Sequence, residues 1–124
     1  MRFMMLVKSA ENKGVPPKEL MDAIAKLGEE ANKAGTMITT GGLAPTSMST
    51  RVRVSRGQLT RTDGPFTEAK EVIGGYAVFE LKSKEEAIKA TTHFMELHKK
   101  HWPGWEGETE IRQIFAPEDF HPNA

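Results

Sequence analysis

Two segments of this 124-residue chain are apolar at nearly every position, namely residues 3–7 and 76–81. A strand without polar alternation is expected to be covered on both faces. The spacing of apolar residues predicts only two amphipathic helices, at 18–33 and 84–100. Two helices cannot cover both faces of a sheet of five or six strands. We therefore expect the second face to pack against a second copy of the chain with two-fold symmetry.

The order of the elements indicates an α+β fold in a single domain over residues 1–124. The pattern predicts strand, helix, strand, hairpin, strand, helix and strand. The strands are expected at 3–7, 36–40, 51–55, 58–62, 72–81 and 110–115, with a loop from 41 to 49 that begins at Gly41-Gly42. Because residues 51–55 alternate between Arg and Val, we expect that strand to be half-buried.

The predicted helix ends carry ordinary signals. Pro17 suits a first turn and Gly35 a stop just beyond the last turn, while Ser83 and Glu86 form a capping box. The apolar stripe of the first helix is typical of a core-facing helix rather than of a ligand site. Its members are Leu20, Ala23, Ile24, Leu27 and Ala31.

Composition excludes several classes of function. Lys plus Arg equals Asp plus Glu at 17 each, so no net field favours nucleic acid or an acidic membrane. The absence of cysteine excludes disulfides, thiolate catalysis and Cys-ligated zinc. No apolar run approaches the roughly 18 residues of a membrane span, and the start lacks the pattern of a signal peptide. We expect a cytoplasmic protein without a cofactor or metal.

The segment between residues 62 and 72 is the most informative loop. Its nine residues, 63–71, exceed the about two to five of a usual hairpin loop. It contains four ionisable side chains: Asp63, Glu68, Lys70 and Glu71. We expect Asp63 to bond the backbone two residues on and Gly64-Pro65 to form a stiff corner.

Residues on either side of this loop extend the candidate site. Arg61 and Asp63 are two and four positions after Leu59, so all three side chains are expected on the same face of the strand. Arg61 and Asp63 then form either a simple ion pair, which is the commoner outcome, or part of a polar pocket. Gly74-Gly75 inside an apolar strand predicts a bulge or a close approach of two backbones.

Aromatic residues gather near the end of the second helix. Ala87, Thr91, Phe94, Met95 and His98 follow one stripe, where a histidine is more often satisfied locally than a ligand. His98 and His101 have only marginal spacing for a metal. Trp102 and Trp105 either form the floor of a pocket or partner surface, or cap the open end of the helix layer.

Residues 63–71, followed by Gly74-Gly75-Tyr76, resemble the signature of the YCII-related family in its DGPF subgroup. Residues 1–7 and 110–114 resemble the first and last strands of that family. The resemblance implies a ferredoxin-like fold, with an antiparallel sheet, two helices on one face and pairing into a dimeric α/β barrel. It assigns no general activity, and some relatives are linked to extracytoplasmic-function sigma factors. Enzyme-like relatives carry a first-helix histidine paired with an aspartate, and residues 18–33 contain no histidine.

Three hypotheses for the function follow. The first is an enzyme, with Asp63 or Glu68 as general acid or base and Arg61 or Lys70 stabilising negative charge. The second is a protein that binds a small molecule without catalysis, and the third is an interaction or regulatory module. Pockets are expected between helices and sheet, or near the Asp63 loop. The candidate ligand-binding residues are Arg61, Gly64, Pro65, Phe66, Lys70, Gly74, Gly75, Tyr76, His98 and Trp102.

The strands that are apolar on both faces predict a homodimer formed through the open face of the sheet. Light scattering is expected to give the mass of a dimer at micromolar concentration. A stable monomer under those conditions would contradict this prediction.

Overall fold

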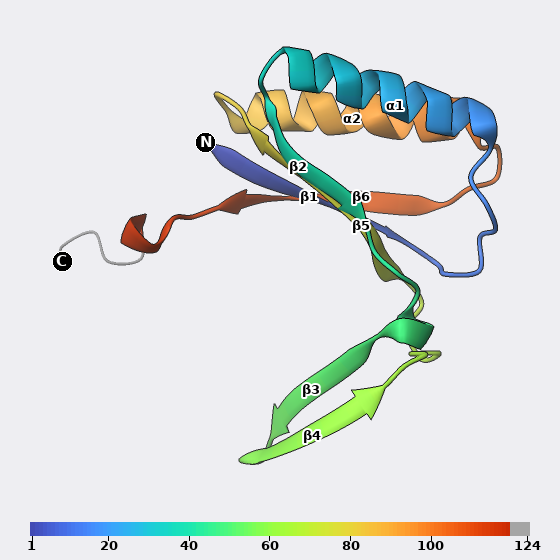
Figure 1. The fold of residues 1–124 in the computed structure, drawn as a ribbon, viewed down its shortest axis with the longest axis vertical. Coiled ribbons are helices and arrows are strands. Elements are labelled where there is room, and N and C mark those ends of the chain that lie inside the picture. The colour runs from blue at the N-terminus through green and yellow to red at the C-terminus, as the bar shows by residue number, and fades with distance from the viewer. Residues whose placement is uncertain (120–124) are drawn as a thin grey trace.

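The computed structural model describes residues 1–119 and confirms the α+β, ferredoxin-like arrangement. Four antiparallel strands lie in the order β2-β5-β1-β6, and both helices pack on one face of this sheet (Figure 1). The strands are β1 (Arg2–Ser9), β2 (Met37–Gly42), β5 (Val72–Glu80) and β6 (Gly107–Ile114). The helices are α1 (Lys18–Lys33) and α2 (Lys84–His101), with short 3-10 turns η1 (Thr46–Met48) and η2 (Pro117–Asp119).

The predicted hairpin exists but does not join the main sheet. Strands β3 (Thr50–Ser55) and β4 (Gln58–Asp63) form a separate two-stranded sheet that extends away from the body (Figure 1). The prediction of a single sheet of five or six strands was therefore wrong. Strand β5 already pairs with β1 on one edge and β2 on the other, so it has no free edge for β4. Residues 64–71 consequently connect two sheets instead of closing a hairpin.

A small core lies between α2 and the sheet. Phe3 and Met5 of β1 are buried with Ala87 of α2, and Phe79 and Ile111 pack against them. The alternate residues of β1, Met4 and Leu6, lie on the opposite face and are only half-buried. The helices thus cover one face of β1. The other face, which is also apolar, is left open.

Local signals placed the helix ends correctly. The Ser83 hydroxyl accepts a hydrogen bond from the Glu86 N–H at 3.2 Å, and the Glu86 carboxylate accepts one from the Lys82 N–H at 2.9 Å. Gly35 follows α1 with a φ of 73°, a conformation that suits glycine. None of the helices within residues 1–119 is long and apolar enough to cross a bilayer.

One of the two glycine pairs forms the predicted feature, and the other does not. The register between β1 and β5 shifts after Val7, which leaves Gly74 as the extra residue of the predicted bulge. Gly41-Gly42, however, continues β2 instead of starting a loop. Gly41 is opposite Tyr76, and a Cβ on Gly41 would lie 2.9 Å from the Tyr76 hydroxyl. A side chain at Gly41 would therefore have to displace the Tyr76 ring, so the close contact here comes from the neighbouring strand and not from a turn.

Candidate functional site

The loop after β4 is fitted tightly against η1. The Gly64 N–H donates to the Ser49 carbonyl at 2.8 Å, and the Phe66 N–H donates to the Thr46 hydroxyl at 3.1 Å. A Cβ on Gly64 would lie 1.6 Å from the Thr46 carbonyl oxygen, so only glycine fits. Phe66 is buried as a result. These positions of the signature therefore hold the loop in place.

Thr46 is also held from the side of the β1–α1 connection. One oxygen of the Glu11 carboxylate accepts the Thr46 hydroxyl at 2.5 Å, and the other accepts the Thr46 N–H at 2.6 Å. These hydrogen bonds favour the ionised carboxylate and lower the pKa of Glu11 below its ordinary value. Glu11, Thr46 and Phe66 thus connect three segments that lie far apart in the sequence.

Asp63 takes part in an ion pair at the base of the β3–β4 hairpin. Its carboxylate lies 3.2 Å from the Arg61 guanidinium and accepts the Thr50 hydroxyl at 2.9 Å. The ion pair is the commoner of the two outcomes expected from the sequence. The prediction that the Asp63 side chain accepts a hydrogen bond from the backbone two residues on was wrong. The residue at that position is Pro65, which has no N–H to donate. Both members of the pair are exposed.

Glu68 is paired as well. Its carboxylate bonds to the Arg51 guanidinium, which lies 3.7 Å from the centre of the Phe66 ring. The hydrogen bond from Arg51 is the largest cause that lowers the pKa of Glu68. Lys70 and Pro65 are exposed in the same loop. Among the described residues, this loop brings Asp63 and Glu68 to structural partners and does not direct them into a shared pocket.

His98 and Trp102 lie at the C-terminal end of α2. The His98 ring nitrogen Nδ1 lies 3.0 Å from the Phe94 carbonyl, and the ring packs 4.6 Å from that of Trp105. Trp102 stacks on Trp105 with 6.0 Å between ring centres. His98 is thus satisfied locally, and the two indoles cap the end of α2. Within residues 1–119, no cluster of three or more His, Asp or Glu side chains is placed to hold a metal.

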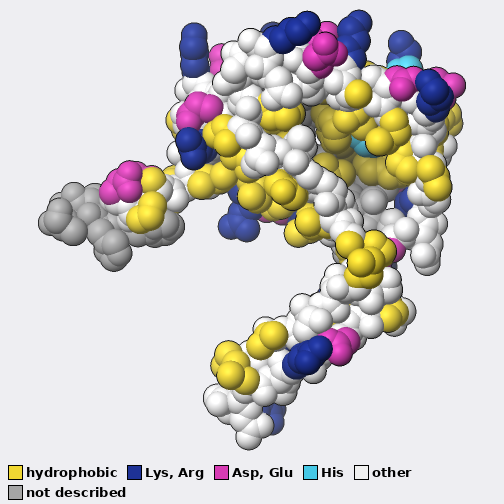
Figure 2. Space-filling model, viewed as in Figure 1, with side chains coloured by type: hydrophobic (Ala, Val, Ile, Leu, Met, Phe, Trp, Pro, Cys, Tyr) yellow, Lys and Arg dark blue, Asp and Glu magenta, His cyan; other side chains and the backbone are white. Residues whose placement is uncertain are grey.

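A large recess lies between the two helices and the sheet. Its volume is about 1080 Å³. Figure 2 shows apolar side chains gathered beneath the helix layer. The apolar lining includes Met5, Val7, Ile24, Leu27, Ala31, Met37, Ala77, Phe79, Leu81, Ala90 and Phe94. We call this recess the helix–sheet cavity.

The cavity corrects the interpretation of the first helix as purely core-facing. Leu20 is fully buried, with 1% of its surface exposed. Ile24, Leu27 and Ala31 on the same stripe line the cavity and are only half-buried. Of the residues proposed from sequence, Gly75 and Tyr76 line the cavity, whereas Asp63 and Glu68 do not.

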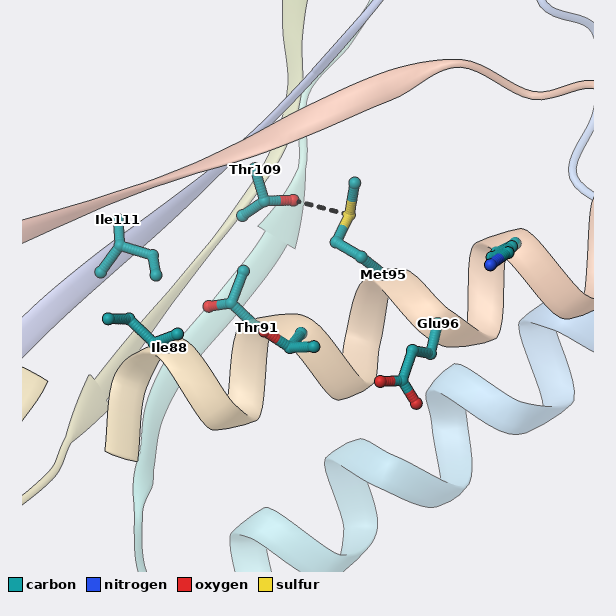
Figure 3. A pocket seen from close by; sticks show the side chains of 8 residues that line it. Ile88, Thr91, Met95, Glu96, Thr109 and Ile111 are labelled. Carbon is teal, nitrogen blue, oxygen red and sulfur yellow. Dashed lines mark hydrogen bonds between the residues drawn. The ribbon is translucent and has the colours of Figure 1, made fainter. Parts of the chain in front are cut away.

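Thr91 is a polar lining residue that the sequence analysis placed in the stripe of α2 but did not propose as a site residue. Only 8% of this residue is exposed, yet its hydroxyl has no hydrogen-bond partner in the described chain. Thr91 lines the helix–sheet cavity and an adjoining depression of about 400 Å³ between α2 and β6 (Figure 3). Thr109 lines both as well, but its hydroxyl already donates to the Met95 sulfur at 3.2 Å. The signal for Thr91 that the sequence contained was a polar residue within the apolar stripe of α2.

A buried hydroxyl without a partner costs about 1–3 kcal/mol, so its presence calls for an explanation.

Comparison with known families supports the resemblance seen in the sequence. The model of the YCII-related domain matches residues 1–94. No curated protein matches the chain.

The steric fit of Gly64 predicts a large effect of adding one methyl group. Gly64→Ala is expected to destabilise the protein by more than about 2 kcal/mol, because the Thr46 backbone would have to move. Gly74→Ala is the matched control, since a Cβ there meets nothing within 4 Å. It is expected to change stability by less than about 1 kcal/mol in urea unfolding. Equal effects of the two substitutions would contradict the steric argument.

The two hydrogen bonds from Thr46 to Glu11 predict a dependence of stability on pH. Because the pKa of Glu11 is lowered in the folded state, its contribution is present above the unfolded value near 4.5 and is lost as the pH falls through the lowered folded value. The difference in unfolding free energy between wild type and Glu11→Gln is therefore expected to shrink below about pH 4.5. Chemical denaturation from pH 7 to 3 measures it, and a difference that grows with acid would refute the assignment.

Proposed function

Because the chain belongs to the YCII-related family, which by itself defines no reaction, we propose its function from the geometry. The protein binds a small, predominantly apolar organic molecule in the helix–sheet cavity. The observation that carries this proposal is the recess itself, about 1080 Å³ in volume and lined mainly by apolar side chains of both helices and the sheet. A ligand placed there gains the apolar contacts that the single chain leaves open.

The dimensions of the cavity agree with this function. Small-molecule sites are usually recesses of about 300–1,000 Å³, mostly apolar, with a few polar groups that fix orientation. Here the volume is about 1080 Å³. A ligand would cover the half-exposed side chains of Ile24, Leu27 and Phe94, which gains about 25 cal/mol for each Å² of apolar surface removed from water.

The polar lining restricts the chemistry of the ligand. Its ionisable members, Glu29, Glu30 and Lys33 of α1 and His93 of α2, are exposed, so they lie at the rim. The interior offers hydroxyls and no opposite charge for an ionised group, whose burial would be costly. We therefore expect a neutral molecule that carries at least one hydroxyl or carbonyl to pair with the hydroxyl groups of the lining.

Binding at this place does not require the loop after β4. Asp63 and Glu68 belong to exposed ion pairs outside the cavity lining. Catalysis by Asp63 or Glu68 remains a hypothesis, and it would need a second site or a movement of the loop. The alternative of a regulatory module linked to a sigma factor stays a prediction from the family resemblance.

A neutral apolar dye, N-phenyl-1-naphthylamine, tests the cavity directly. Its fluorescence is expected to rise saturably with one dye per chain. Ala90→Phe places a ring in the cavity and is expected to weaken binding at least tenfold, equivalent to about 1.4 kcal/mol. Lys89→Phe adds the same ring at the neighbouring exposed position and is expected to leave the affinity unchanged.

Two further variants complete this experiment. Thr91→Val keeps the shape but removes the unpaired hydroxyl, so the protein is expected to fold at least as stably as wild type. Asp63→Asn is expected to leave dye binding unchanged, with a stability change below about 1 kcal/mol. Loss of dye binding in Asp63→Asn, or full binding in a folded Ala90→Phe protein, would overturn the assignment of the cavity.

A further inference from the structure

The β3–β4 hairpin, residues 50–63, concentrates the arginines of the chain on one element that extends from the body (Figure 1); we call this hairpin the arm. It contains four of the six arginines in the sequence and none of the eleven lysines. Its one acid is Asp63, so the arm carries a net charge of +3 and the rest of the neutral chain carries −3. The chain as a whole has no net field, but its positive charge is segregated onto the arm.

The choice of arginine over lysine indicates the kind of anion that the arm suits. The guanidinium group is a planar fork of donors that matches the oxygens of a phosphate group, whereas the lysine ammonium is a point charge. Arginine is therefore the preferred cation where phosphate is bound by paired hydrogen bonds.

One face of the arm consists of side chains that can donate hydrogen bonds. Side chains at alternate positions of a strand share a face, and the register pairs the two strands across it. The members of this polar face are Arg51, Arg53 and Ser55 of β3, with Thr62, Thr60 and Gln58 of β4 opposite them. These residue types are the ones that proteins commonly place on DNA phosphates. A two-stranded ribbon also fits the major groove of B-DNA, which is about 12 Å wide.

Two of the four arginines are free to bind an external anion. Arg51 and Arg61 already pair with acidic side chains of the following segment. Arg53 and Arg56 are exposed and form no ion pair with any residue from 1 to 119. The free guanidinium groups thus belong to the part of the arm that lies farther from its base.

The turn between β3 and β4 contains an arginine where other residues fit better. Arg56 has a φ of 54° and Gly57 a φ of 75°, both in the left-handed region. Gly, Asn and Asp are the usual residues in such a turn, because a bulky side chain is strained there. A strained residue at an exposed turn points to a function of its side chain. Arg56 thus adds a cation at the end of the arm.

The base of the arm holds these groups in a defined direction. The Gly64 N–H donates to the Ser49 carbonyl at 2.8 Å, and Phe66 is buried in the loop that follows. Arg51 lies over the Phe66 ring, with 3.7 Å from its guanidinium carbon to the ring centre. Because the arm is already oriented, less conformational entropy is lost when it binds.

The distribution of side chains favours a nucleic acid over a lipid surface. Val52, Val54 and Leu59 lie on the face opposite Arg53, as the register shows. A ribbon that inserted this apolar face into a membrane would direct Arg53 away from the anionic headgroups. The polar face can meet a duplex without using the apolar face, which stays available to the second copy of the chain expected from the sequence.

We propose that the arm binds double-stranded DNA, with its polar face in the major groove and with Arg53 and Arg56 on phosphate groups. This inference does not depend on the helix–sheet cavity or its ligand. Contacts to phosphate carry no sequence information, so binding is expected to be independent of sequence. Because each contact releases a counterion, the affinity is expected to fall steeply with salt.

Fluorescence anisotropy of the full chain with a labelled duplex tests the proposal. Wild type is expected to bind with a Kd on the order of 10⁻⁵ M at about 50 mM salt. The double variant Arg53→Gln with Arg56→Gln is expected to weaken binding at least about tenfold. It is also expected to reduce the slope of log K against log salt by about 1.8, since each lost phosphate contact contributes about 0.9.

The matched control is Lys82→Gln with Lys84→Gln, which removes the same charge from exposed positions outside the arm. It is expected to leave both the affinity and the slope unchanged. Circular dichroism shows whether each variant is folded. Arg56→Gly replaces the double variant if that protein does not fold, because glycine suits the left-handed turn, and it is expected to reduce the slope by about 0.9.

Three results would overturn the proposal. The first is wild type that does not bind the duplex at about 50 mM salt. The second is an equal loss of affinity in the arginine and lysine double variants, because the arm would then have no special role. The third is binding to phosphatidylglycerol vesicles or to polyglutamate at least as tight as binding to DNA, which would assign the arm to a membrane or to an acidic protein.

Discussion

The pairing of β5 on both of its edges determines the arrangement of the rest of the chain. With β1 on one side and β2 on the other, β5 cannot accept β4, although β4 precedes it in the sequence. The hairpin therefore has no place beside β5, and it forms a separate two-stranded sheet that extends from the body (Figure 1). The loop after β4 consequently connects two sheets instead of closing a hairpin.

The contacts made by the loop that connects the two sheets explain why the sequence of this loop is so specific. Gly64 has no room for a Cβ beside Thr46, and Phe66 is buried under the Arg51 guanidinium. Glu11 reaches the same threonine from the β1–α1 connection. In this structure these loop residues orient the β3–β4 hairpin relative to the body. Their chemistry as acids or bases is not needed for that role, and Asp63 and Glu68 serve it through ion pairs.

The helix–sheet cavity and the open face of the sheet are separate consequences of a small core. The buried cluster of that core joins α2 to the sheet, through Ala87 against Phe3 and Met5. Below α1 the sheet remains uncovered enough to leave the cavity, and on the other face the sheet has no covering layer among the described residues. A ligand and a second copy of the chain would fill these two spaces, and either would add apolar burial that the single chain lacks.

Sequence alone determined the features that depend on near neighbours. The capping box at Ser83, the glycine after α1 and the bulge at Gly74 follow from local hydrogen bonds and dihedral preferences. The spacing of apolar residues was enough for the α+β class, and the ferredoxin-like arrangement was implied by the resemblance to the YCII-related family. Tertiary structure decided the rest. Which strand occupies the edges of β5, how far α1 stands from the sheet and whether Thr91 finds a partner depend on contacts between distant segments. Periodicity shows that a face is apolar, but it does not show whether protein, ligand or a second copy covers that face.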